Sequence, residues 1–316
     1  MTVRNAAFTA ALLAFPLAAQ ISSGPTLGGC PLFPEDHIWN TRVDQLPLDK
    51  RSQAYVRSIG AGLELHPDFG AGLWRGSPAG IPYNIVPSGQ PAVPVVLESP
   101  AESDPGPVPM PARPLIEADA DPNADRHLLI LQQEKCILYE LYRVFQTPTG
   151  WKAGVSVRFD LRSYQLRPAW WTSADAAGLP ILPGLVRWEE VAAGRIAHAV
   201  RFTAPRTRNA WVWPGRHRAS SLTSPELPPM GQRFRLRASF DTSGYSAQAK
   251  VILEALKQYG MLLADNGSPW YVSGAPNENW TSSLIAELKR VRGGDFDAVE
   301  STSLIVNPDS GRARKR

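Results

Sequence analysis

The chain has 316 residues, 43% of them hydrophobic and 20% charged, with a formal net charge of +4. This is an ordinary globular composition, long enough for a sizeable core in one large or two modest domains. The small positive charge comes without any nucleic-acid-binding motif, so we expect no nucleic-acid partner. Proline is abundant, at 30 residues against a usual share of about 5%, which favours turns and sheet edges over long helices.

The first 19 residues predict a secretory signal peptide. Arg4 supplies a positive charge, and Ala6 to Ala18 form an apolar stretch. Leu17-Ala18-Ala19 resembles the small-residue site at which signal peptides are cleaved. The alternative is a buried N-terminal helix. No later segment is long and apolar enough to span a membrane, so we expect a secreted protein, extracellular or periplasmic, without a membrane span.

Residues 20–306 are predicted to form a single secreted domain. Cys30 and Cys136 are the only cysteines, and an even count in an exported protein indicates one disulfide, although two free buried thiols are the alternative. The proline-rich stretch 98–114 lies between strand-like segments inside the predicted bridge, so it reads as a long ordered loop rather than a domain linker.

Alternating apolar and polar residues predict several strands. Residues 125–131 and 136–145 form a hairpin pattern, and residues 151–161 and 232–241 each present one apolar face, which is typical of antiparallel sheet. Helical spacing marks three further segments, at residues 48–59, 246–259 and 280–292. The predicted fold class is therefore mainly β (α+β): an antiparallel β-sandwich or distorted barrel with a few peripheral helices. The basic tail, residues 307–316, is predicted to be disordered.

The densest run of conformationally demanding residues is 170–203. Ser173 to Ala177 predicts a short helical turn, and two prolines three apart make Leu179 to Gly184 a rigid, extended, apolar segment. In the strand that follows, His198 lies on the more apolar face and Arg201 on the other. His198 is therefore a core histidine or a site histidine on the floor of a sheet.

Two carboxylates stand out because they occur in apolar strands. Glu140 is flanked by hydrophobic and aromatic residues, so it needs either an arginine partner or a site role. Asp265 ends the apolar run 261–264, which is a frequent place for a catalytic carboxylate, but the following Asn266-Gly267 also makes it an ordinary turn residue.

Aromatic and basic side chains interleave between residues 206 and 218, a composition suited to stacking against sugar rings and hydrogen bonding to their hydroxyls. An arginine-rich surface loop is the alternative. The residues that we expect to contact a polysaccharide or oligosaccharide are Trp171, Trp213, His217, Trp270 and Arg201.

Familiar catalytic and cofactor motifs are absent. The sequence contains no G-x-S-x-G, P-loop, H-E-x-x-H or C-x-x-C, and the five histidines lack metal-ligand spacing, so no cofactor or metal is expected. Several short runs resemble a family of exported, uncharacterised bacterial proteins: Asp125-Arg-His127, Tyr139-Glu140-Leu-Tyr142, the run from Ser173 through SADAAGLPILPGLVR, Pro229-Met-Gly231 and Ala264-Asp-Asn-Gly267. The resemblance covers nearly the whole mature chain. It implies export and one domain, and it assigns no catalytic residue.

The sequence leads to a hypothesis of a secreted carbohydrate-active protein, a glycoside hydrolase using paired carboxylates about 5–5.5 Å apart for retention or 6.5–9.5 Å for inversion. The candidate pair is Glu140 and Asp265, with Asp160 or Asp241 as substitutes, and His198 and His217 would orient or share protons. One alternative is a non-catalytic extracellular module that binds glycan or protein. Another is a lyase or peptidase with His198 or His217 as its base.

Overall fold

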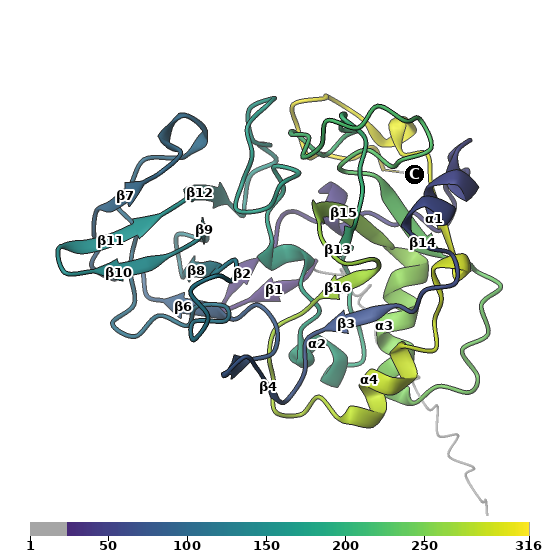
Figure 1. Ribbon diagram of the computed structural model, residues 1–316, viewed down its shortest axis with the longest axis horizontal. Helices are drawn as coiled ribbons and strands as arrows, with labels where there is room; N and C mark the ends of the chain where they lie inside the picture. The colour runs from purple at the N-terminus through teal and green to yellow at the C-terminus, as the bar shows by residue number, and fades with distance from the viewer. Residues whose placement is uncertain (1–23, 316) are drawn as a thin grey trace, which may run out of the picture.

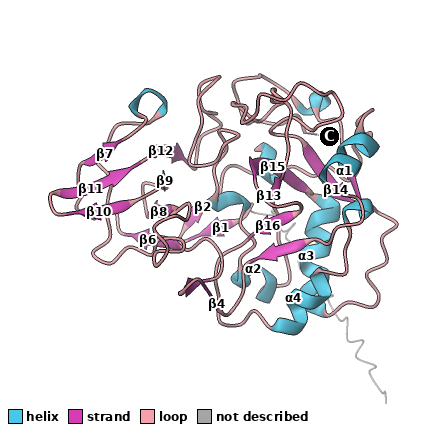
Figure 2. Ribbon diagram, viewed as in Figure 1, coloured by secondary structure: helices cyan, strands magenta, loops and turns pink. Residues whose placement is uncertain are grey.

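The computed structural model describes residues 24–315, so the predicted signal peptide lies outside the described residues. The fold is mainly β with α-helices, as predicted, and it contains several sheets in a sandwich-like arrangement (Figures 1 and 2). None of the described sheets closes into a barrel. In Figure 1 two groups of strands lie side by side, one on the left and one on the right with the helices.

The left-hand group contains a four-stranded and a three-stranded sheet. The four-stranded sheet has the order β12-β9-β8-β6, with β6 at Tyr83–Val86, β8 at Leu128–Gln132, β9 at Ile137–Tyr142 and β12 at Val155–Asp160. The three-stranded sheet has the order β10-β11-β7, with β7 at Val95–Leu97, β10 at Phe145–Thr147 and β11 at Gly150–Ala153. The predicted hairpin is confirmed as β8 and β9, which are consecutive strands paired antiparallel from Leu128 opposite Leu141 to Gln132 opposite Ile137.

The right-hand group is a six-stranded sheet with helices around it. Its order is β17-β14-β15-β13-β16-β3, with β3 at His66–Asp68, β13 at Val200–Ala204, β14 at Arg233–Leu236, β15 at Met261–Asn266, β16 at Tyr271–Ser273 and β17 at Phe296–Ala298. The helices are α1 at Ser52–Ile59, α2 at Trp188–Ala192, α3 at Ala247–Gln258 and α4 at Ser282–Leu288. Helix α3 packs against β14 and also contacts α2 and α4, so the helices are peripheral as expected.

Short elements complete the fold. Two small hairpins are formed by β1 at Thr26–Leu27 with β2 at Cys30–Pro31, and by β4 at Leu73–Trp74 with β5 at Ser77–Pro78. Single-turn 3-10 helices occur at Ile38–Asn40, Pro100–Glu102, Leu182–Gly184, Gly293–Asp295 and Thr302–Leu304. The predicted helical turn at Ser173 is a non-helical turn, in which the Ser173 hydroxyl accepts from the Asp175 amide at 2.9 Å.

The sheets are mixed, whereas the sequence predicted antiparallel ones. Parallel pairing occurs between β6 and β8, β7 and β11, β13 and β15, and β3 and β16. Alternation along a strand reports which face is buried, and it carries no information on the direction of the neighbouring strand. The prediction was therefore correct for the fold class and wrong for these pairs.

The predicted disulfide is confirmed. Cys30 and Cys136 are bonded with their Cα atoms 5.3 Å apart, and 106 positions separate them in the chain. The bond joins β2 to the turn before β9, so it fastens the N-terminal hairpin to the four-stranded sheet. Among the described residues, no helix has both the length and the hydropathy of a membrane span.

The C-terminal segment differs from its prediction. We expected residues 307–316 to be disordered, but residues 307–315 lie against the domain. The backbone of Arg312 forms an isolated β-bridge with His37, and that of Ser310 forms one with Gln165. Ala313 is almost fully buried. The reason is that Arg216, buried within the domain, uses the carbonyl of Pro308 (2.8 Å) and the carboxylate of Asp309 (2.5 Å) as acceptors.

Candidate functional site

The Glu140 side chain is fully buried, and its carboxylate binds backbone amides instead of facing solvent. Its carboxylate accepts hydrogen bonds from the amides of Ile181 (2.9 Å) and Leu182 (2.8 Å). Burial raises the pKa of Glu140 to about 7, although these two hydrogen bonds act in the opposite direction. The carboxylate thus anchors the proline-containing segment 179–184. The predicted catalytic role is not supported, because a side chain without exposed surface cannot reach a polysaccharide.

His198 is also a structural residue. Its ring is buried, Nδ1 lies 2.7 Å from the carbonyl of Ala199, and Nε2 lies 3.0 Å from the carboxylate of Glu190. Arg187 bonds the same carboxylate at 2.7 Å. Of the two interpretations that the sequence left open, the structure favours the core histidine, so His198 is a poor candidate for a proton carrier or base.

Arg201 and Asp265 belong to a buried charge network. Arg201 makes a two-pronged ion pair with Asp175, at 2.6 and 2.8 Å, and donates to the Ser273 hydroxyl at 2.5 Å. Asp265 lies 3.7 Å from Arg201 and keeps 28% of its side chain exposed. Burial, and then the charge of Asp175, raise the pKa of Asp265 to about 7. Asp265 is therefore an acid that retains a proton near neutral pH.

The predicted sugar-binding tryptophans are mainly structural. Trp270 has no exposed surface and packs among Phe202, Phe234 and Phe296 in the centre of the core. Trp213 is buried, and its indole N–H donates to the carbonyl of Ser310 at 2.9 Å. Both rings bury a large apolar area that an open sugar site would leave in water. The prediction for these two residues is not supported.

Of the remaining predicted residues, Trp171 and Asp160 line one cavity together, whereas His217 and Asp241 do not line it. His217 is half-buried, with Nδ1 3.0 Å from the carbonyl of Ala176. Trp171 is half-buried beside Arg167. Asp160 is the exposed last residue of β12, and Asp241 is an exposed acid at the start of a turn. Neither Glu140, His198 nor Asp265 lines any of the cavities described below.

A different set of acids meets in the largest of these cavities, which has a volume of about 630 Å³. It lies between the β3–β16 edge of the six-stranded sheet and the loop that leads into β8. Figure 1 shows β3 and β16 near the middle of the molecule, between the strands around β8 and the helices. Three carboxylates line it: Asp68 at the end of β3, and Glu117 and Asp125 in the loop before β8.

Glu117 is paired with the buried His127. Its carboxylate lies 2.5 Å from His127 Nδ1, and His127 Nε2 lies 3.1 Å from the carbonyl of Ala174. Burial alone would lower the pKa of His127, but the Glu117 charge overrides it and raises this pKa to about 9. Burial alone would raise the pKa of Glu117, but the protonated ring holds it below the ordinary 4.5. Glu117 is therefore ionised at neutral and mildly acidic pH.

The pKa of Asp68 is shifted in the opposite direction. Although the Asp68 side chain is exposed, desolvation by the protein around it, and then the negative charge of Glu117, raise the pKa of Asp68 above the ordinary 3.8, against an opposing effect of Arg201. The register of β3 with β16 places Asp68 opposite Ser273, the residue to which Arg201 donates. One cavity thus contains a carboxylate that stays charged and another that keeps its proton to higher pH.

Aromatic side chains line the same cavity. The rings of His66 and Tyr271 stack with centroids 3.9 Å apart and planes within 9°, and Trp74 is half exposed. Arg75 lies over the Trp74 ring and bonds Asp121, which joins the β4–β5 hairpin to the loop that carries Glu117. The cavity combines flat apolar surfaces with carboxylates. Within the described residues, no group of three or more histidine, cysteine or acidic side chains is arranged to hold a metal ion.

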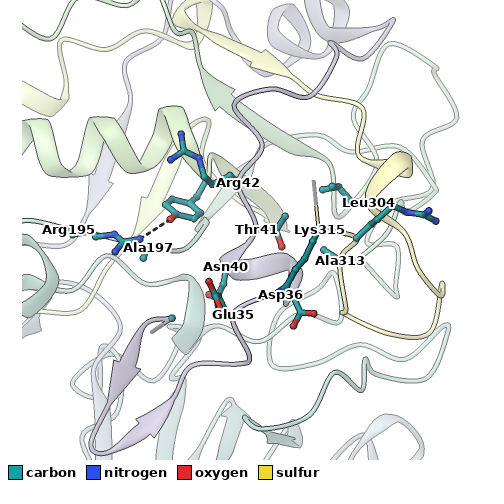
Figure 3. A pocket seen from close by; sticks show the side chains of 13 residues that line it. Glu35, Asp36, Asn40, Thr41, Arg42, Arg195, Ala197, Leu304, Ala313 and Lys315 are labelled. Atoms are coloured by element: carbon teal, nitrogen blue, oxygen red, sulfur yellow. Dashed lines mark hydrogen bonds between the residues drawn. The ribbon is translucent and has the colours of Figure 1, made fainter. Parts of the chain in front are cut away.

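A second cavity, of about 440 Å³, lies where the N-terminal and C-terminal segments meet (Figure 3). Glu35, Asp36 and Asn40 line one side, and Arg195 lies 3.5 Å from the hydroxyl of Tyr259. Asp36 already serves Tyr164 and Arg312 as a hydrogen-bond acceptor. Burial would raise the pKa of Asp36, but its hydrogen bonds with Tyr164 and Arg312 hold this pKa below the ordinary 3.8, so Asp36 is a charged acceptor rather than a proton donor.

The sequence pointed only weakly to the cavity that contains Asp68, Glu117 and Asp125. Asp125-Arg-His127 is part of the resemblance, and His66-Pro-Asp68 lies between glycines in a segment that reads as a flexible loop. Glu117 follows the proline-rich stretch and carries no distinguishing pattern. Its partnership with His127 depends on the loop folding back, with the Glu117 amide donating to the His127 carbonyl at 2.9 Å.

No protein-family profile matches the chain, and no curated protein or solved structure shows significant similarity to it.

Proposed function

We propose that the protein is a secreted carbohydrate-active enzyme, a glycoside hydrolase, whose paired carboxylates are Asp68 and Glu117. The observation that carries this proposal is that both line one cavity while their surroundings move their pKa values in opposite directions. Such a contrast between two carboxylates assigns the general acid and the charged partner in glycoside hydrolysis. The earlier pair, Glu140 and Asp265, is replaced because neither residue lines the cavity.

The chemistry follows from the two protonation states. Protonated Asp68 donates its proton to the glycosidic oxygen as the bond to the anomeric carbon breaks. Ionised Glu117 either takes a proton from the attacking water or attacks the anomeric carbon itself, and the configuration of the product distinguishes these routes. His127 is a positioning residue, because its positive charge keeps Glu117 ionised and oriented.

The cavity walls fit a sugar better than a peptide or a nucleotide. The stacked His66 and Tyr271 rings and the exposed face of Trp74 offer flat apolar surfaces, and Asp125 adds a hydrogen-bond acceptor. Pyranose rings present one apolar C–H face and a rim of hydroxyls, which this combination complements. Three carboxylates in one cavity disfavour a phosphate-bearing ligand.

Secretion is part of the proposal. It is supported by the predicted signal peptide, by the resemblance to exported bacterial proteins, and by the disulfide, since such bonds persist in oxidising compartments.

The test is hydrolysis of a panel of polysaccharides and oligosaccharides by the mature protein, followed by reducing-end analysis. We expect Asp68→Asn and Glu117→Gln to lower kcat/KM on the cleaved glycan by about 10²- to 10⁴-fold, the usual contribution of acid–base groups. The matched control is Asp241→Asn, an exposed acid in a turn, which keeps wild-type activity. Full activity in either cavity variant would refute the assignment.

The pH profile provides a second readout. Activity requires ionised Glu117 and protonated Asp68, so it falls at low pH as Glu117 gains a proton and at high pH as Asp68 loses one. His127→Asn removes the positive charge beside Glu117, so we expect the acid limb of the profile to move to higher pH. An unmoved acid limb in a folded, active His127→Asn protein would contradict the role given to this pair.

The alternative of a non-catalytic glycan-binding module makes a different prediction. Such a module binds a polysaccharide without releasing reducing ends, and Glu117→Gln leaves its affinity unchanged. A lyase or peptidase with His198 as base is disfavoured, because both nitrogens of that buried ring are already engaged.

A further inference from the structure

Two tryptophans form an exposed aromatic corner away from the acidic cavity. Trp170 is 58% exposed, which is unusual for so large a ring, and its indole meets that of half-buried Trp211 edge to face. The ring centroids are 4.2 Å apart with planes at 86°. The Trp170 ring is therefore in contact with Trp211 while more than half of its surface remains exposed to solvent.

The corner is held rigidly by the surrounding chain. The backbone of Trp170 has φ of 75°, in the left-handed region that bulky residues avoid. Its amide donates to the carbonyl of Arg216 at 2.8 Å, and the Arg218 guanidinium lies 5.5 Å from the Trp170 ring centroid. A strained conformation kept at a solvent-exposed tryptophan costs free energy without adding to the core, which points to a role outside folding.

A polar hollow adjoins the same loop. Its volume is about 360 Å³, and its lining includes Arg158, Asp160, Gln165 and Trp171. Arg167 lies 5.1 Å from the Trp171 ring centroid and is bonded to Asp104 at 2.5 Å. Trp171 follows Trp170 directly in the chain, so a hollow rich in hydrogen-bonding groups lies next to the aromatic corner.

We propose that the Trp170–Trp211 corner and the adjoining hollow form a glycan-binding surface, separate from the acidic cavity, that holds a chain of pyranose units. A flat indole face stacks on the C–H face of a sugar, and the arginine, glutamine and carboxylate groups of the hollow bond its hydroxyls. The acids and arginines in the hollow balance each other in number, which suits an uncharged polysaccharide. The surface goes beyond hydrolysis, because it binds the polymer without reaching the bond to be cut.

The test is affinity electrophoresis in gels containing xylan, mixed-linkage β-glucan, galactomannan or pectin. All variants carry Glu117→Gln, so that the polysaccharide is not degraded during the run. We expect at least one uncharged polymer to retard the protein, and Trp170→Ala to weaken that binding about tenfold, equivalent to about 1.4 kcal/mol. Trp211→Ala should act in the same direction, and Trp170→Phe should restore part of the binding because it restores a flat ring.

Val96→Ala is the matched control, since Val96 is an exposed apolar residue (72%) on a strand remote in the chain. The proposal is overturned if no polymer, or only the negatively charged pectin, retards the protein, or if Trp170→Ala binds as tightly as the parent while remaining folded by circular dichroism. A Trp170→Ala protein that keeps Glu117 is then assayed for cleavage of a short oligosaccharide, and this assay separates the two proposals. That activity should be unchanged, and binding lost at Trp170 without any hydrolysis by the wild type would sustain the surface and refute the hydrolase.

Discussion

At the scale of single residues, the molecule uses carboxylates in two ways. Glu140 accepts backbone amides within the core, and Asp175 neutralises Arg201, so both hold the chain together. Asp68 and Glu117 line a cavity that a ligand can enter. Sequence patterns drew attention to Glu140 because it is surrounded by apolar residues, but that same environment removes it from contact with any substrate.

Glu140 should impose a pH dependence on stability. Its pKa is about 7 in the folded protein and 4.5 ordinarily, so between these values the unfolded chain binds fewer protons than the folded one. Stability contributed by this group is complete below pH 4.5 and is lost as the pH rises to about 7, by about 3 kcal/mol. Glu140→Gln cannot ionise, so relative to wild type it should gain about that much between pH 4.5 and 7.5 in urea unfolding.

Glu140→Ala is the comparison that isolates the hydrogen bonds. It leaves the amides of Ile181 and Leu182 buried without an acceptor, so we expect it to be less stable than Glu140→Gln at both pH values, by about 2–5 kcal/mol. A constant difference between Glu140→Gln and wild type across this pH range would show that the carboxyl does not titrate as described.

At the scale of elements, the local patterns identified helices and strands well. The spacing of Ala249, Ile252, Leu253 and Leu256 gave helix α3, and all four side chains are buried. Ser246 caps this helix, since its hydroxyl accepts from the Ala249 amide at 3.3 Å. The C-terminal segment was misjudged because its basic composition is visible in the sequence, whereas the buried Arg216 that binds it is not.

Removal of residues 307–316 should therefore destabilise the protein. The truncation leaves Arg216 and the Trp213 indole N–H without their acceptors Pro308, Asp309 and Ser310. We expect a loss of about 2–4 kcal/mol in the free energy of unfolding, measured by urea titration. A chain that lacks only Arg316 is the control and should unfold as the wild type does. Equal stability of the two truncated chains would mean that the segment adds nothing.

At the scale of the whole molecule, the disulfide and the cavity both join parts that are distant in the chain. The bond from Cys30 to Cys136 encloses α1 and the strands β3 to β8 in one loop. The cavity is lined from this loop and from β16 near the C-terminal part of the fold. The cavity therefore forms only when the two groups of strands are assembled.

Loss of the disulfide should weaken the entire domain. For a loop of about 100 residues, the chain-entropy estimate is a loss of about 4.7 kcal/mol. We expect the Cys30→Ala/Cys136→Ala variant to unfold at lower urea concentration than the oxidised wild type. Reductant should move the wild type in the same direction and leave the variant unchanged. A wild-type midpoint that is insensitive to complete reduction would contradict this account.

The amino-acid sequence by itself determined the fold class, the main strands and helices, and the disulfide, because each depends on local periodicity or on a residue count. Only the tertiary structure decided which strands run parallel and which acids share a cavity. The pairing of Glu117 with His127, and the place of Asp68 in the same cavity as Glu117, arise from segments that meet after folding. Periodicity specifies the face on which a side chain lies, but the partner that sets its charge is supplied by the rest of the chain.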